Sequence, residues 1–294
     1  MSKDRVHISV VVAAHNARAS VAECLLALTA QQLTENAEIV VVDNSTDGTT
    51  EIIRERLPQL RLFIAPPAAL IPELWATGIR QTSGDIVALT TAHCVPAKDW
   101  LRQIRQAHQA PVPAVGGAIE NDTLAGIVDW AVYFCRYSHY MLPLQERFVA
   151  EIAGDNASYK RVYLDRYQQA WRQGFWEPSV HAELRRAGLP LLLAPSIVIC
   201  HKRSFGFWAF MQQRFQHGMR FGQWRAAPLT VAQRALHVLR SPAIPLLLLG
   251  RIGRQVVAKR RHLRQFVLCL PVLMLFLLSW TAGEAAGHLG GPEQ

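Results

Sequence analysis

The chain has 294 residues, of which half are hydrophobic and 18% are charged. This composition excludes an intrinsically disordered chain and a disulfide-stapled mini-protein. Charge is unevenly spread: residues 1–200 carry 18 Lys/Arg and 20 Asp/Glu, residues 201–264 carry 13 basic residues and no acid, and residues 265–294 carry two acids and no base. We therefore expect an ordinary folded domain over 1–200, followed by a basic region and an apolar carboxyl-terminal part.

Apolar strands alternate with helices through the first third of the chain. Continuous apolar runs predict strands over 6–14, 38–42, 61–65 and 85–90, and helical periodicity predicts helices over 20–32, 48–57 and 73–81. This alternation predicts an α/β fold with a mostly parallel central sheet and flanking helices. Ligands bind at the carboxyl ends of the strands in such a sheet. Neither G-x-G-x-x-G nor a P-loop follows a strand, which disfavours dinucleotide binding and P-loop chemistry.

Several motifs follow the predicted strands in a distinctive order. They are ISVVVAAHN, DNSTDGT, SGDIVALTTAHCVPAKDWL, GGAIEN, GDNASYKR and RRAG. Together, over roughly residues 6–200, they resemble the family-2 glycosyltransferases of the GT-A fold. The resemblance implies an inverting transferase that takes a sugar from a nucleotide-sugar donor and moves it to a lipid-linked or membrane-proximal acceptor.

The resemblance also implies where the donor binds. Asp43, at the end of the second strand, matches the residue that receives the nucleobase, and Ala14, Asn16 and Gly78 match positions that line the donor pocket. From the residues alone, Asp43 has an alternative role in an Asx-turn or helix cap, which Asp47 fits better. A simple turn role remains the alternative for Asn16.

The sequence departs from the family at the end of the fourth strand. Relatives carry Asp-x-Asp there, and the metal ion sits on the second Asp, whereas this chain has Thr91-Ala92-His93. Thr91 can still bind a ribose. His93 can bind Mn²⁺ but suits Mg²⁺ poorly, or can donate directly to the diphosphate. The alternative function is a catalytically inactive domain that acts as a membrane-bound binding or scaffold protein.

Four positions are expected on the acceptor side of the pocket. The resemblance places Glu120 of GGAIEN there, with Asp155, Asn156 and Ser158 of GDNASYKR. The second motif is also predicted to open a helix, so capping by Asp155 or Asn156 is the alternative role.

The catalytic base is expected near the RRAG motif. Counting back from it, Glu177 occupies the position of the family's base, and His181 lies one helical turn further on, where it would orient Glu177 or relay a proton. The alternative for Glu177 is a first-turn acid that the helix dipole favours.

The carboxyl-terminal part predicts a membrane tether. Residues 265–283 carry no charge over nineteen positions, enough for a transmembrane helix, and 284–294 form a short tail. The run 241–250 is too short to span alone, so we expect it in the membrane interface. The basic residues Lys259, Arg260, Arg261 and Arg264 precede the span and predict that the 1–200 domain lies on the cytoplasmic face.

Residues 201–264 form a basic region with its own pattern. Trp208, Met211, Phe215 and Met219 share one helical face, with basic residues between them, which predicts an amphipathic helix on an anionic membrane surface. Nucleic-acid binding is the alternative, disfavoured by the neighbouring span. The same basic residues could instead hold a lipid-phosphate acceptor or the leaving nucleoside diphosphate.

Overall fold

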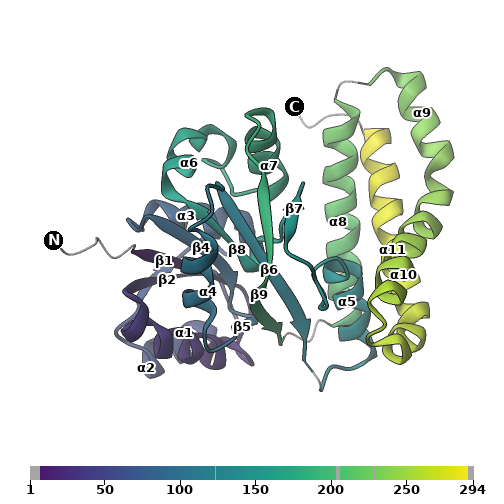
Figure 1. Ribbon diagram of the computed structural model, residues 1–294. Coiled ribbons are helices and arrows are strands. Elements are labelled where there is room, and N and C mark those ends of the chain that lie inside the picture. Colours follow the sequence, from purple (N-terminus) through teal and green to yellow (C-terminus); the bar gives the residue numbers. More distant parts are fainter. Residues whose placement is uncertain (1–6, 123, 203–205, 228, 291–294) are drawn as a thin grey trace. The chain divides into compact units, whose positions relative to one another are not determined.

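The computed structural model describes residues 7–122, 124–202, 206–227 and 229–290 (Figure 1). The chain forms two compact units. The first comprises residues 1–122 and 140–203, and the second comprises 123–139 and 204–294. Residues 123–139 thus belong to the second unit, although they lie within the 1–200 region of the sequence.

The first unit is built on a mixed sheet, with nine strands in the described residues. Their order is β3-β2-β1-β4-β8-β6-β9-β5, and β7 pairs with β9. The four strands β3, β2, β1 and β4 are parallel, as predicted, whereas β8 runs antiparallel to both β4 and β6. The bounds are β1 (Ile8–Ala14), β2 (Ala37–Asp43), β3 (Arg61–Ile64), β4 (Ile86–Thr91), β5 (Cys94–Pro96), β6 (Ala114–Asn121), β7 (Arg147–Val149), β8 (Ala157–Lys160) and β9 (Leu191–His201).

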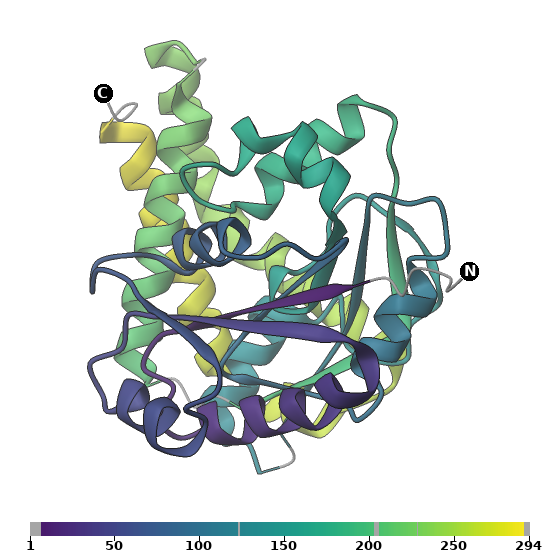
Figure 2. The same cartoon turned by 90° about the vertical axis from the view of Figure 1, so that its left-hand side faces the viewer.

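Helices cover both faces of this sheet (Figures 1 and 2). They are α1 (Val21–Glu35), α2 (Thr49–Arg56), α3 (Ile71–Arg80), α4 (Trp100–Ala107), α6 (Arg161–Arg166) and α7 (Glu177–Arg186), with 3₁₀ turns η1 (Gly154–Asn156) and η2 (Gln168–Ala170). Helices α3, α6 and α7 share one core with β1, in which Leu74, Leu164 and Leu184 pack with Val11. Strands β1 and β4 are buried along their whole length and β2 everywhere except at Glu38, as their sequences predict, whereas the edge strand β3 is exposed or half-buried.

The GDNASYKR segment corrects one prediction. It does not open a helix directly: Gly154–Asn156 form η1, and the next four residues form β8 before α6 begins at Arg161. β8 pairs with β4 on one side and β6 on the other, so its sheet pairing outweighs the local helical pattern.

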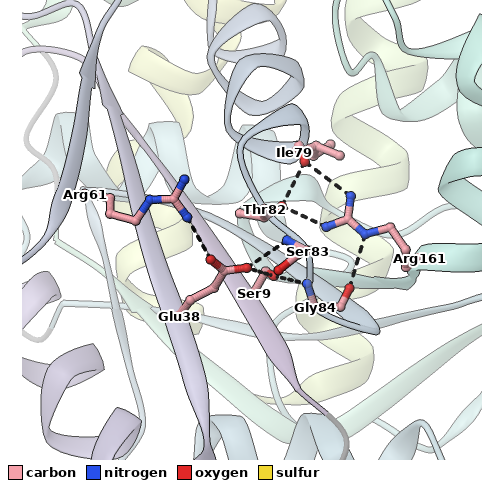
Figure 3. A network of polar contacts seen from close by, with 8 residues as sticks. All are labelled: Ser9, Glu38, Arg61, Ile79, Thr82, Ser83, Gly84 and Arg161. Atoms are coloured by element: carbon pink, nitrogen blue, oxygen red, sulfur yellow. Dashed lines mark hydrogen bonds and ion pairs between the residues drawn. The ribbon is translucent and has the colours of Figure 1, made fainter.

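A polar network closes the amino-terminal edge of the parallel strands (Figure 3). Glu38 accepts hydrogen bonds from the Ser9 hydroxyl (2.6 Å) and the Ser83 N–H (2.8 Å), and pairs with Arg61 (2.8 Å). Burial alone would raise the pKa of Glu38, but these hydrogen bonds and the nearby charges hold it below its usual value. The network fixes the start of β4 against β1 and β2.

Arg161 extends this network from the first turn of α6. Its guanidinium donates to the Thr82 hydroxyl (2.8 Å) and to the carbonyls of Ile79 and Gly84 (3.2 Å each). The α3–β4 connection is therefore held from both sides, at the edge opposite the strand ends where ligands are expected.

The second unit is helical. It contains α5 (Ile127–Tyr137), α8 (Phe207–Ala226), α9 (Val231–Arg240), η3 (Ser241–Ala243), α10 (Ile244–Lys259) and α11 (Leu263–Gly290). Helices α8 and α11 run parallel, because Phe210 meets Phe276 and Gly222 meets Glu284. A Cβ atom at Gly218 or Gly222 would lie about 2 Å from backbone oxygens of α11. Such close backbone contact through small residues is typical of membrane helices.

Two helical stretches of this unit are long and apolar enough to cross a membrane, Val231–Lys259 and Leu263–Gly290, and they are compatible with a membrane anchor. The run 241–250, expected to lie alone in the interface, is part of the first of these, which has 29 residues. The second extends beyond the predicted 265–283 and takes up most of the expected tail. Exposed leucines, including Leu239 and Leu247, face outward from the first stretch.

On α8, the face predicted to be apolar is exposed at Trp208 (78%) and Phe215, while Phe210, Gly218 and Gly222 are buried. The backbone of Met211, Phe215 and Met219 on that face lies against α11, together with Gly218 and Gly222, which the aromatic pattern did not reveal. Residues 203–205 of the predicted basic region lie outside the described residues.

Candidate functional site

The candidate site begins where β1 and β2 end side by side. Ala14 and Asp43 are register partners at these ends, and both are fully buried. Asp43 accepts hydrogen bonds from the N–H (2.9 Å) and hydroxyl (2.5 Å) of Ser45, and from the Thr50 hydroxyl. Its carboxylate thus forms an Asx-turn, the alternative considered from the sequence, while it stays at the predicted place in the sheet.

Asn16 links the two strand ends. It has a left-handed backbone (φ 49°), its N–H donates to the Ser45 hydroxyl (2.8 Å), and its Oδ1 accepts the Thr46 N–H (3.0 Å). Asp47 accepts the N–H groups of Thr49 and Arg18 (3.1 Å each), directly before α2, whose N-cap residue is Gly48. Hydrogen bonds therefore join the loop after β1 to the loop after β2.

The end of β4 carries Thr91 and His93, both buried. The His93 ring lies between two protein groups, with Nε2 3.1 Å from the His15 carbonyl oxygen and Nδ1 3.3 Å from the Ser20 hydroxyl. Thr91 Oγ1 lies 3.3 Å from Asp155 Oδ1. His93 thus ties the start of α1 to the loop after β1.

These positions do not fit a conventional divalent-metal site. In the described residues, no group of three or more His, Cys, Asp or Glu side chains is arranged to hold a metal ion. Both ring nitrogens of His93 contact protein atoms, so binding of a metal ion by this ring would replace one of these contacts.

Glu177 lies at the centre of the acidic part of the site. It is the first residue of α7, and its Oε1 accepts the Gly154 N–H at 3.1 Å. Burial raises the pKa of Glu177, and the negative charge of buried Asp155 raises it further. The structure thus places Thr91, Asp155 and the half-buried Glu177 next to one another.

His181 does not contact Glu177 as predicted. Its buried ring lies with Nδ1 2.5 Å from Glu151 Oε2 and Nε2 2.9 Å from the Tyr159 hydroxyl. Within the described residues, no hydrogen bond joins it to Glu177, so it neither orients nor relays directly. Its ring instead links α7 to Glu151 and to Tyr159 of β8.

Two residues predicted on the acceptor side hold the sheet together instead. The Asn156 side chain donates to the carbonyls of Ala118 (2.8 Å) and Ile197 (3.0 Å) and accepts the Trp100 indole N–H (2.8 Å). Ser158 Oγ, fully buried, lies 2.8 Å from His108 Nε2. Their hydrogen-bonding groups therefore face strands and helices rather than the pocket.

Gly78 and Glu120 also have roles within the fold. A Cβ atom at Gly78 would lie 2.2 Å from the Val11 side chain, so glycine lets α3 approach β1 closely. This explains Gly78 by packing rather than by donor binding. Glu120 accepts the Leu142 N–H at 2.8 Å.

Sequence reasoning missed Trp75, Glu151 and Tyr159. The buried Trp75 indole donates to the Thr90 carbonyl (2.8 Å), and its ring packs against Gly154 beside Glu177. Trp75 lies in α3, the helix directly before β4, and this position in the sequence could have pointed to it. Glu151 and Tyr159 meet His181 only through the fold, and no spacing in the sequence points to them.

The chain resembles known proteins in sequence and in fold. The profile of glycosyl transferase family 2 matches residues 9–168. Glycosyltransferase AglE of Haloferax volcanii is 34% identical over 119 residues, which are 38% of this chain and 39% of AglE. The chain thus aligns with well under two thirds of that relative.

Two solved structures are similar in fold. One is the mannosyltransferase PcManGT of Pyrobaculum calidifontis in complex with GDP-Man and Mn²⁺ (TM-score 0.57, 18% identity, 96% of this chain and 88% of that one). The other is S. aureus TarS 1–349 in complex with UDP-GlcNAc (TM-score 0.53, 13% identity, 98% and 93%). At these identities the likeness establishes the fold, and it confirms the predicted GT-A-like class.

Proposed function

Because the chain belongs to glycosyl transferase family 2 and is a glycosyltransferase, we propose that it transfers a sugar, with inversion, from a nucleotide-sugar donor to a lipid-linked acceptor. The observation that carries this proposal is Glu177, held by the Gly154 N–H and adjoining Asp155 beside the end of β4. Glu177 and Asp155 both lie at the edge of the sheet where the parallel strands end and where ligands bind in such folds.

The donor occupies the rim formed by the ends of β1, β2 and β4. Asp43 accepts the nucleobase N–H in place of one of its local hydroxyl donors, and Asn16 and Thr91 flank the ribose. PcManGT and TarS were each solved with a nucleoside diphosphate sugar, which supports this donor class.

Glu177 acts as the general base. Its carboxylate takes the proton of an acceptor hydroxyl, the acceptor oxygen bonds to the anomeric carbon, and the bond to the diphosphate breaks on the opposite side. The raised pKa of Glu177 suits this role, because a base works best when its pKa lies near the operating pH. A phosphate acceptor is already an anion and needs no base.

Helix Leu263–Gly290 anchors the enzyme beside its acceptor by one crossing. The basic residues Lys259, Arg260, Arg261 and Arg264 lie at the start of this helix or just before it and favour the cytoplasmic side. With one crossing the catalytic unit lies on that same face, whereas a further crossing by Val231–Lys259 would put it on the opposite face.

Purified full-length protein in detergent tests the proposal with two measurements. A panel of nucleoside diphosphates should raise the melting temperature, since ligand at one hundred times its Kd stabilises by about 2.7 kcal/mol. Glu177→Gln should lower turnover, while Glu183→Gln, a control on the same helix whose acid pairs with Arg186, should not. Stabilisation without turnover would favour the inactive binding protein, and no stabilisation by any nucleotide would contradict the proposal.

A further inference from the structure

One tryptophan of the first unit is exposed, and it directly precedes the proposed base. Trp176 is the residue before Glu177, and its side chain is 39% exposed. The other three tryptophans of this unit, Trp75, Trp100 and Trp171, are at most 3% exposed. Burying so large an apolar side chain stabilises a fold, and the fold does not gain this at Trp176.

Trp176 and Glu73 converge over Gly174. A Cβ atom at residue 174 would lie 3.1 Å from Nε1 of the Trp176 indole and 3.6 Å from Cγ of Glu73. Glu73 lies in the first turn of α3, and the Phe175 N–H donates to the Pro72 carbonyl oxygen (2.7 Å). This hydrogen bond joins the segment before α7 to the start of α3, so the two side chains are neighbours although they are far apart in the sequence.

Both side chains retain unused hydrogen-bonding groups. Glu73 is exposed, and its Oε2 accepts the Leu70 N–H at 2.6 Å. Among the residues that the structure describes, no hydrogen bond engages Glu73 Oε1 or the Trp176 indole N–H, and no cation pairs with the Glu73 carboxylate. An exposed ring, a donor and a carboxylate oxygen are therefore open to a ligand at one place.

The pair lies at the edge of the sheet that carries the candidate site. Helix α3 begins after the loop that follows β3, and the Asn44 side chain, just after β2, donates to the carbonyls of Pro67 (3.3 Å) and Ala69 (2.6 Å) in that loop. The start of α3 is thereby fixed beside the strand ends where ligands bind. A molecule bound on Trp176 would lie beside Glu177, the carboxylate proposed to take its proton.

We propose that Trp176 and Glu73 form a sugar-binding surface for the acceptor, so that the attacking hydroxyl is carried by a saccharide. This deepens the proposed function, on which it rests, by naming the acceptor class as a lipid-linked saccharide. The electron-rich face of an indole attracts the C–H groups on one face of a sugar ring. A carboxylate accepts strong hydrogen bonds from sugar hydroxyls. A sugar hydroxyl is uncharged and benefits from a general base, which agrees with the role of Glu177.

Saturation-transfer NMR on full-length protein, in a detergent without a sugar headgroup, tests this surface. The probes are the methyl glycosides of glucose, galactose, mannose and N-acetylglucosamine, with glycerol as the control polyol. Ring protons of at least one glycoside should receive saturation, and glycerol should not. No signal from any of the four glycosides, or an equal signal from glycerol, would overturn the proposal.

Competition distinguishes the acceptor from the sugar of the donor. GDP and UDP should leave the glycoside signal in place, and so should GDP-Man and UDP-GlcNAc, because the acceptor surface stays free when the donor binds. Loss of the signal with a nucleotide sugar but not with its diphosphate would assign the surface to the donor sugar and overturn the proposal.

Variants locate the surface. Trp176→Ala should weaken glycoside binding about tenfold, and Trp176→Phe should recover part of the loss because a ring face remains. Glu73→Gln should also weaken binding, while its amide oxygen can still accept the Leu70 N–H. Trp208→Ala, at an exposed tryptophan of α8, should bind like the unchanged protein. Unchanged binding in Trp176→Ala, or an equal loss in Trp208→Ala, would overturn the proposal.

Stabilisation by a nucleoside diphosphate is measured in the same samples. Its absence in the unchanged protein would count against the proposed function. Its presence without glycoside binding would count against this surface alone.

Discussion

The N–H of Gly154 donates to Oε1 of Glu177 at 3.1 Å, joining the turn before β8 to the first residue of α7. A Cβ atom at residue 154 would lie 2.6 Å from that oxygen and 2.7 Å from the Trp75 ring. Backbone alone can occupy this point, so the position of the proposed base depends on a glycine.

Replacing this glycine should misplace the base without removing it. Gly154→Ala should lower kcat at least tenfold and leave donor affinity nearly unchanged, because Asp43 and Asn16 lie on other loops. Steady-state kinetics and nucleotide titration measure the two effects. Gly250→Ala, where a Cβ meets open space, is the matched control. Full activity in Gly154→Ala would show that catalysis does not depend on the position of Glu177.

Removing the carboxylate of Glu177 should lower turnover further. For an acceptor hydroxyl, general-base catalysis contributes about 10²–10⁴-fold, and kcat of Glu177→Gln should fall by that factor. Asp43→Ala should instead weaken donor binding more than it slows bound-state turnover. Normal turnover in Glu177→Gln would indicate a phosphate acceptor that needs no base.

The pH profile should report the raised pKa of Glu177. Burial and Asp155 both raise it, so the protonated form persists to higher pH and activity should fall on the acid side above the usual carboxyl range. Asp155→Asn removes one of these causes, and the acid limb of kcat should move to lower pH. An acid limb that stays in place would show that Asp155 does not set the protonation of the base.

Metal dependence should be weak. The described residues offer no conventional metal cluster, and Thr91 and His93 stand where relatives carry carboxylates. We expect modest loss of activity in chelator and, if an ion restores it, Mn²⁺ to act better than Mg²⁺. Complete loss in chelator with full recovery by Mg²⁺ would point to a carboxylate site that forms with the donor bound.

The α8–α11 contact should be intolerant of side chains. In Gly222→Ala the new methyl group would lie 2.2 Å from the Glu284 carbonyl oxygen, so the helices must separate. Overpacking of this kind costs about 1–3 kcal/mol. The melting temperature in detergent should fall, whereas Gly250→Ala should leave it unchanged. An unchanged melting temperature in Gly222→Ala would mean that the two helices are not held by this contact.

The sequence predicted the parts of the site that depend on local pattern. Runs of buried residues located β1, β2 and β4, and their polar ends placed Asp43 and Thr91 at one edge of the sheet. Glu177, located by counting back from RRAG, is the first residue of α7, which is the position that its alternative role as a first-turn acid requires.

Other features depend on pairing between distant segments, which local pattern does not reveal. Residues 157–160 were predicted to belong to a helix. They form β8 instead, because the neighbouring strands β4 and β6 offer hydrogen bonds on both sides. Asn156 and Ser158 were assigned to the pocket, although partners 38 to 56 residues away engage their side chains. His181 likewise found Glu151 rather than its helix neighbour Glu177.

The division of the chain into two units sets an order on its biosynthesis. Helix α5 is made between β6 and β7, yet Trp130 packs on His262 and Phe134 packs on Phe266. Those partners leave the ribosome more than a hundred residues later. The aromatic face of α5 therefore stays uncovered while the later strands of the sheet are made. Transiently exposed apolar surface of this kind is bound by chaperones. The helical unit is therefore completed only after all the described strands of the sheet have been made.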